Sequence, residues 1–250
     1  MTFTTGSEVT FVSSKLHFMT QGGEIPTLAL AYARYHNIMF SHATPASTAQ
    51  TTALQVVKVS VEDRSEDYPQ LQTDESYTLS VDANGISLSS KTIYGALHGL
   101  ETLSQLIMYD FDQGVYVISA TPIYVADAPR YPHRGVLLDT SRHFQPVSFI
   151  QNVIDSLAYA KYNVFHWHVV DTQSFPFQSL SSPRLWMGAY SKTEKYSHED
   201  IVQIVEYGRQ RGVKVMIEFD MPGILLPLPP PLYLSELPLP PALNPFNLPH

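Results

Sequence analysis

An apolar run at 135–138 and a β-rich run at 162–170 lead directly to an aspartate, Asp139 and Asp171 respectively. Between the runs, apolar residues recur at the three-to-four-residue spacing of an amphipathic helix. Two strands joined through a helix run parallel, and parallel strands are buried on both faces. Charged groups are then tolerated where the strands end, which is where α/β folds bind their ligands. The pattern predicts a βαβ unit with its chemistry at the carboxyl edge of a parallel sheet.

Upstream of residue 125, strands and helices mix without this alternation. Asp82-Ala83-Asn84-Gly85 predicts a hairpin, because an Asn-Gly pair accepts positive φ. A short strand at 116–119 is expected to lead into a proline-containing linker at 121–132. The other predicted elements are strands at 9–18 and 54–61 and helices at 27–38 and 92–108. Residues 1–125 are therefore predicted to form an α+β domain.

A third βα repeat follows the first two. Ser197-His198-Glu199-Asp200 has the spacing of a capping box, and the helix behind it precedes a strand at 213–219. Three such units over 126–223 suggest the opening part of a (β/α)8 TIM barrel, and a doubly wound sheet has the same local pattern. Residues 224–250 hold 9 of the chain's 19 prolines, so an irregular Pro/Leu-rich tail is expected there.

Composition narrows the class of protein. The hydrophobic content of 44% and charged content of 15% fit a soluble globular protein with a sizeable core. The net charge of −8, with no basic block, argues against nucleic acid as a partner. The absence of cysteine excludes disulfides, thiol nucleophiles and Cys-zinc sites. The amino terminus lacks the pattern of a signal peptide, and no apolar run is long enough for a membrane span.

Ionisable residues gather beside the predicted strand ends. A guanidinium and a carboxylate in one mouth can hold the hydroxyl groups of a sugar through charge-assisted hydrogen bonds. The alternative is a ring of ion pairs that only closes the rim. The residues concerned are Arg134, Asp139, Arg142, Asp171, Glu218 and Asp220. The acid pair Asp74-Glu75 is expected at an exposed edge of the leading domain.

His166 and His168 share one face of a strand, because side chains alternate with period two. Together with Asp171 or Glu218 they have the residue types of a zinc site in a metal-dependent hydrolase. The other interpretation is a polar layer in which both histidines are hydrogen-bonded to carboxylates of adjacent strands. The second interpretation is preferred, so neither a metal nor a cofactor is expected.

Several segments resemble the β-N-acetylhexosaminidases of glycoside hydrolase family 20, over roughly residues 25–223. The resemblance implies removal of terminal N-acetylhexosamine with retention of configuration, in which the sugar's acetamido oxygen attacks the anomeric carbon. It implies substrate-binding roles for Arg134 and Asp171 and supporting roles for Glu218, Asp220, His166 and His168. The segments that carry it are YPHRGVLLDTSRHFQPV, AYAKYNVFHWHVVDTQSFPFQS, YSHEDIVQIVEYGRQRGVKVMIEFDMPG, DESYTLSV and IYGALHGLETLSQL.

The chain also departs from this family's pattern. Ile224 stands where the family has a histidine after EFDMPG, and the adjacent Asp-Glu catalytic pair of a later strand is missing. A carboxyl-terminally truncated, inactive member is therefore expected, with no catalytic residue of its own. The alternative is a catalytically dead sugar-binding or regulatory protein. The family resemblance further implies amino-sugar glycans as partners, a lysosomal or secreted location, and a parent protein that forms dimers.

Overall fold

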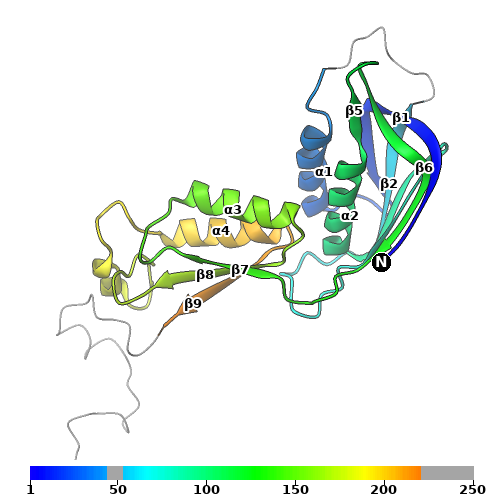
Figure 1. The fold of residues 1–250 in the computed structure, drawn as a ribbon. Coiled ribbons are helices and arrows are strands. Elements are labelled where there is room, and N and C mark those ends of the chain that lie inside the picture. Colours follow the sequence, from blue (N-terminus) through cyan, green and yellow to red (C-terminus); the bar gives the residue numbers. More distant parts are fainter. Residues whose placement is uncertain (44–52, 221–250) are drawn as a thin grey trace, which may run out of the picture. The chain divides into compact units, whose positions relative to one another are not determined.

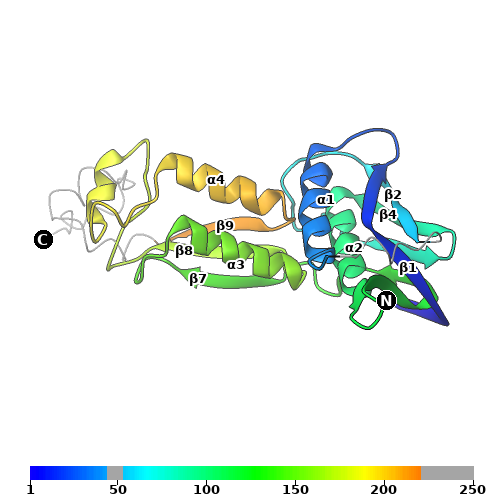
Figure 2. The same cartoon turned by 90° about the horizontal axis from the view of Figure 1, so that it is seen from above.

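The computed structural model describes residues 1–43 and 53–220, and the chain divides into two compact units (Figures 1 and 2). The first unit contains Met1–Arg134 together with the short segments Asp155–Asn163 and Arg209–Lys214. The second contains Gly135–Ile154, Val164–Gly208 and the described residues from Val215 onward. The Pro/Leu-rich stretch 224–250, predicted to be irregular, lies outside the described residues.

The first unit is built on a mixed sheet with the strand order β1-β2-β4-β3-β6-β5. The β1–β2 and β2–β4 pairs are parallel, and the remaining pairs are antiparallel. Strand β1 also pairs with β6, using its first part for β6 and its last part for β2. The strands are β1 (Thr2–Thr20), β2 (Leu54–Asp63), β3 (Tyr77–Asp82), β4 (Gly85–Thr92), β5 (Met108–Asp110) and β6 (Val115–Asp127).

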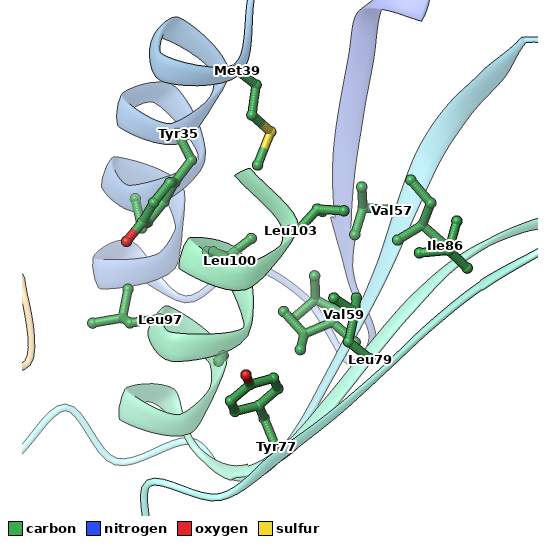
Figure 3. Packing of buried hydrophobic residues seen from close by; sticks show 14 of the residues in the cluster. Tyr35, Met39, Val57, Val59, Tyr77, Leu79, Ile86, Leu97, Leu100 and Leu103 are labelled. Atoms are coloured by element: carbon green, nitrogen blue, oxygen red, sulfur yellow. The ribbon is translucent and has the colours of Figure 1, made fainter. Parts of the chain in front are cut away.

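Helices α1 (Pro26–Met39) and α2 (Ile93–Leu106) pack on each other and lie along one face of this sheet (Figure 1). Figure 3 shows the core between them: Tyr35 and Met39 from α1, Leu100 and Leu103 from α2, and apolar side chains of the strands. Helix α2 begins where the Thr92 side chain accepts a hydrogen bond from the Gly95 N–H. The predicted α+β character of this region is thus observed.

Two local predictions in this unit were wrong in detail. Strand β6 does not stop at residue 119 but continues to Asp127 through the expected linker, because Pro122 lies at an irregularity in the β1–β6 register. The hairpin between β3 and β4 is present, but neither Asn84 nor Gly85 has positive φ. The turn is instead held by the Asp82 carboxylate, which accepts hydrogen bonds from the Asn84 and Gly85 N–H groups at 2.7 and 3.1 Å.

The second sheet has the strand order β7-β8-β9. Gly135 to Asp139 of β7 pair in parallel with Val164 to His168 of β8, as the sequence predicts. Helices α3 and α4 lie side by side over one face of this sheet (Figures 1 and 2). The elements are β7 (Gly135–Asp139), α3 (Val147–Tyr159), β8 (Val164–Val170), a 3-10 helix (Pro183–Gly188), α4 (His198–Arg209) and β9 (Lys214–Phe219).

The start of α4 is fixed by the predicted capping box. The Asp200 N–H donates to the Ser197 hydroxyl oxygen at 3.1 Å, and the Ser197 N–H donates to the Asp200 carboxylate at 2.9 Å. Helix α3 begins at Val147. Within residues 1–43 and 53–220, no helix has the length and apolar character needed to cross a membrane.

A buried ion pair ties together distant segments of the first unit. Glu75 is 6% exposed and accepts from the Arg134 guanidinium at 2.6 Å and from the Asn163 amide at 3.0 Å. The same guanidinium donates to the carbonyls of Tyr131 and Lys161 at 2.8 Å each. Burial alone would raise the pKa of Glu75, but His98 and Arg134 beside it hold that pKa below its usual value.

Replacement of Gly95 by alanine tests the close contact between α2 and the sheet. A Cβ at Gly95 would overlap the Ser76 carbonyl oxygen, a backbone atom that cannot swing away. Overpacking costs about 1–3 kcal/mol and the gain in helix propensity returns about 1 kcal/mol. Because the added Cβ would lie only 2.3 Å from that oxygen, the cost should be at the upper end, and we expect urea denaturation to show a net loss of about 2 kcal/mol. The control Gly85→Ala meets no atom within 4 Å and should change stability by less than about 0.5 kcal/mol.

Replacement of Arg134 by methionine tests the buried pair. It leaves the Glu75 carboxylate buried without its guanidinium, which should lower the free energy of unfolding by about 3–5 kcal/mol. The exposed Arg130→Met is the matched control, expected within about 0.5 kcal/mol of the parent. The double variant R134M/E75Q should recover a large part of the loss. Additive losses in the double variant would contradict the pairing.

Candidate functional site

The carboxyl ends of β7, β8 and β9 bring a set of charged side chains together. Strand β9 runs in the same direction as β8, because Lys214 N–H donates to the Asn163 carbonyl at their starts and Glu218 meets His166 and His168 further along. All three strands therefore end at one edge of the sheet, as predicted. The side chains gathered there are Asp139, Arg142, His166, His168, Asp171, Glu218 and Asp220.

Asp171 lies at the centre of this group, with only 2% of the residue exposed. One carboxylate oxygen accepts from the Thr172 N–H and hydroxyl, and the other faces His168 at 3.0 Å and also pairs with Arg142. Burial would raise the pKa of Asp171, but the hydrogen bonds from His168 and Thr172 and the charge of Arg142 lower it. Asp171 is therefore a buried anion whose oxygens are already occupied.

Arg142 is the accessible member of the group, with 53% of its side chain exposed. Its guanidinium donates to Asp139 at 2.7 Å and forms a second ion pair with Asp171. Asp139 also accepts from the N–H groups of Ser141 and Arg142 at 3.0 Å each, which fixes the loop after β7. These bonds outweigh burial and lower the pKa of Asp139. Two carboxylates thus hold one guanidinium whose other half faces solvent.

The two histidines of β8 both contact Glu218 of β9. His166 Nε2 lies 2.5 Å from the carboxylate oxygen, and His168 Nδ1 lies 3.2 Å from the same oxygen. The neighbouring β8 residues Phe165 and Trp167 are fully buried, as the alternation predicts. The preferred interpretation, a polar layer bonded to carboxylates of adjacent strands, is therefore the arrangement observed.

Glu218 and Asp220 form a carboxyl pair at the end of β9. A hydrogen bond with Glu218 raises the pKa of Asp220, so Asp220 retains its proton more readily than an isolated aspartate. The same bond is the largest cause that lowers the pKa of Glu218. The bonds from His168 and His166 act in the same direction, and together these bonds outweigh the effect of burial. Within this pair Glu218 therefore ionises more readily than an isolated glutamate.

The donor atoms are also close enough together to hold a metal ion, in the groups Asp139-His168-Asp171 and His168-Glu218-Asp220, whose atoms lie within 4.8 Å of one another. Coordination needs an imidazole lone pair directed at the ion. Both ring nitrogens of His168 are instead directed at carboxylate oxygens, at 3.0 and 3.2 Å. The geometry favours ion pairing over a metal centre, and we assign no metal ligand.

The expectation that Arg134 and Asp171 lie in one mouth is wrong. Arg134 directly precedes Gly135 at the start of β7, whereas Asp171 follows the end of the parallel strand β8, so the two residues lie at opposite edges of the sheet. The Arg134 guanidinium is directed at Glu75 and two backbone carbonyls. The expectation that Asp74-Glu75 lies at an exposed edge is also wrong for Glu75, which is buried by this pair.

Sequence reasoning placed Arg142 and Asp139 among the strand-end residues but gave neither a role. Both lie on the carboxyl side of β7: Asp139 is its last residue, and Arg142 lies in the loop that follows. The signal that identifies them is the direction of the strand. A residue after a parallel strand reaches the ligand-binding edge, and a residue before the strand does not.

Comparison with known proteins matches both parts of the chain. The family model for the glycosyl hydrolase family 20 catalytic domain matches residues 131–226, and the model described as beta-acetyl hexosaminidase like matches residues 2–106. Beta-hexosaminidase subunit B2 of Dictyostelium discoideum is 40% identical over 221 residues, which are 87% of this chain and 39% of that protein. Human beta-hexosaminidase subunit beta is 42% identical over 211 residues, covering 82% and 37%.

Solved structures show the same fold. A chitobiase from Flavobacterium johnsoniae aligns with a TM-score of 0.74 and 28% identity, covering 89% of this chain and 34% of that one. An exo β-N-acetylglucosaminidase from Vibrio harveyi aligns with a TM-score of 0.70 and 21% identity, covering 90% and 36%. This chain spans about two fifths of the length of the curated relatives above. It belongs to glycoside hydrolase family 20, the family of the β-hexosaminidases that it matches.

Proposed function

We propose that the group at the carboxyl ends of β7, β8 and β9 binds the ring hydroxyls of a terminal N-acetylhexosamine. In a complete catalytic domain this site would serve a retaining, substrate-assisted hydrolysis of terminal, non-reducing N-acetylhexosamine residues. The three βα units would then be the opening part of a (β/α)8 barrel. The observation that carries the proposal is the half-exposed guanidinium of Arg142, held by Asp139 and Asp171.

The chemistry of this arrangement suits a sugar. A guanidinium offers planar, forked donors that match two adjacent hydroxyl oxygens, and charge-assisted hydrogen bonds are roughly twice as strong as neutral ones. Asp139 and Asp171 fix the fork before a ligand arrives, so little side-chain entropy is lost on binding. The substrate-binding role expected for Asp171 becomes that of an anchor for Arg142, since Asp171 is only 2% exposed.

Structural relatives support an amino-sugar ligand. The Vibrio harveyi enzyme was solved in complex with N-acetylglucosamine, and a Streptomyces plicatus β-hexosaminidase variant was solved with its product GlcNAc. The second structure aligns with a TM-score of 0.70 and 24% identity. Both share the overall fold of this chain. Terminal N-acetylhexosamine is therefore the proposed ligand class.

We further propose that these 250 residues do not catalyse hydrolysis by themselves. Family resemblance implies an adjacent Asp-Glu pair as the catalytic groups. The single Asp-Glu dipeptide in the sequence is Asp74-Glu75, and Glu75 is buried against Arg134 in the first unit. The chain would then bind sugar without turnover, which is also what the alternative of a catalytically dead sugar-binding protein requires.

Removal of the Arg142 guanidinium tests the binding proposal. Arg142→Ala should weaken binding of N-acetylglucosamine about 10- to 100-fold, because about 1.5–3 kcal/mol of charge-assisted hydrogen bonding is lost. Arg142→Lys keeps the charge but not the fork, so we expect an intermediate affinity. Isothermal titration calorimetry measures both. Arg184→Ala, at an exposed arginine in the 3-10 helix, is the control. Equal affinities for R142A and R184A would exclude Arg142 as the sugar contact.

An activity assay tests the second proposal. Loss of general acid catalysis alone reduces rates by about 10²- to 10⁴-fold. We expect the purified chain to release no 4-nitrophenol above the blank from 4-nitrophenyl N-acetyl-β-glucosaminide. The Dictyostelium discoideum relative serves as the positive control in the same buffer. Steady turnover by the chain, unchanged on further purification, would show that its own residues supply a proton donor.

A further inference from the structure

His168 has an unusual environment for an imidazole, since each ring nitrogen faces a different carboxylate. Nε2 lies 3.0 Å from an Asp171 oxygen, and Nδ1 lies 3.2 Å from a Glu218 oxygen. The side chain is 8% exposed, so water cannot substitute freely for either partner. The two carboxylates come from the ends of different strands, β8 and β9. His168 therefore bridges two elements of the sheet through one ring.

The bridge requires a particular protonation state. A neutral imidazole has one N–H donor and one lone pair, so it can donate to only one of the two carboxylates. The lone pair would then face the other carboxylate oxygen, and two acceptors at 3.0–3.2 Å repel one another. An imidazolium has two donors and a positive charge, and it satisfies both contacts. The geometry is that of the charged form.

The charges around His168 act in the same direction. Asp139 at the end of β7, Asp171 at the end of β8 and Glu218 on β9 all favour the charged ring. Burial opposes this effect, but the pKa of His168 is still raised above its ordinary value. The other charged and titratable groups of the site contact the partners of the ring. Arg142 pairs with Asp171, and His166 and Asp220 are hydrogen-bonded to Glu218.

We propose that His168 is a positioning residue whose imidazolium joins Asp171 to Glu218, so that Arg142 is held in place for the sugar only while His168 keeps its second proton. The part of this inference that concerns sugar binding rests on the proposed function. The contact Asp171–His168–Glu218, called the brace below, is a property of the three side chains and is testable without any ligand. Nothing in the brace is used to move a proton to the substrate.

The sign of the pH dependence follows from the raised pKa. A group with a raised folded-state pKa contributes its stabilisation fully below the unfolded value, about 6.5 for histidine, and loses it as pH rises through the folded value. Above that value one of the two carboxylates loses its donor. In either case the ring is neutral, so Arg142 is the charged partner that Asp171 keeps, and the link from Asp171 to Glu218 on β9 is broken. Sugar affinity should therefore fall as the pH rises above about 6.5.

Nitrogen-15 NMR of the histidine rings in the full 250-residue chain tests the brace without ligand. We expect the His168 ring to show two protonated nitrogens at about pH 6 and to titrate above the value of a free histidine, about 6.5. Glu218→Gln removes one of the two charges and should move the midpoint downward. A neutral His168 ring at pH 6, or a midpoint unaffected by E218Q, would refute the brace.

Calorimetry with N-acetylglucosamine between pH 5.5 and 8.5 tests the coupling to the sugar. The parent chain should lose affinity about tenfold or more over this range, which is the effect of losing one hydrogen bond to a charged group. His168→Gln should bind weakly at pH 5.5 and show a flat profile, because its amide cannot gain a proton. The matched control His166→Gln removes the neighbouring contact to the same Glu218 oxygen and should keep the pH dependence.

The two measurements separate the possible failures. If His168 titrates as expected but the chain binds no sugar at any pH, the proposed function fails and the brace stands. If the chain binds sugar with the same profile in H168Q as in the parent, the brace has no effect on Arg142 and the positioning role is refuted. Thermal unfolding followed by circular dichroism shows whether H168Q is folded. Should it be unfolded, E218Q takes its place in the calorimetric comparison. Its sugar affinity should then fall at a lower pH than that of the parent, and an unchanged profile would refute the positioning role.

Discussion

Parallel pairing of β7 with β8 gives the second sheet two chemically different edges, and the chemistry of this protein follows from that difference. Every residue that precedes a strand lies at one edge, and every residue that follows a strand lies at the other. Arg134 and Arg142 flank the same five-residue strand, yet they reach opposite edges of it. Because a short strand is all that separates them, chain direction alone determines which arginine meets Asp171.

Burial then separates the roles of the two arginines. The Arg134 side chain is 18% exposed, and its guanidinium donates to the Glu75 carboxylate and to the backbone carbonyls of Tyr131 and Lys161. The Arg142 guanidinium is anchored on one side by carboxylates and faces solvent on the other. An arginine that is paired with a buried carboxylate stabilises a fold, because its removal leaves that carboxylate unpaired. An arginine such as Arg142, which is held by carboxylates and is also exposed, can still donate hydrogen bonds to a ligand.

Local patterns were sufficient to predict the parallel βαβ unit, the hairpin and the capped start of α4, because each depends on residues near one another in the chain. Partners of high sequence separation were not predictable in this way. Glu75 meets Arg134 and Asn163 across 59 and 88 residues, so no local pattern could show that it is buried. The strand predicted at 116–119 was too short, because Pro122 lies at an irregularity in the ladder and does not end the strand. Strand direction distinguishes Arg142 from Arg134, whereas the motif resemblance points to Arg134.

The balance of charge at the carboxyl edge explains why a histidine lies in the middle of it. Asp139, Asp171, Glu218 and Asp220 are four acids within one group, and Arg142 by itself cannot compensate them. The group responds in two ways. Asp220 retains its proton more readily, as its raised pKa indicates, and His168 carries a second one. With His168 charged and the pKa values of Asp139 and Asp171 lowered, these two carboxylates remain ionised, which is the state that orients a guanidinium without further reorganisation.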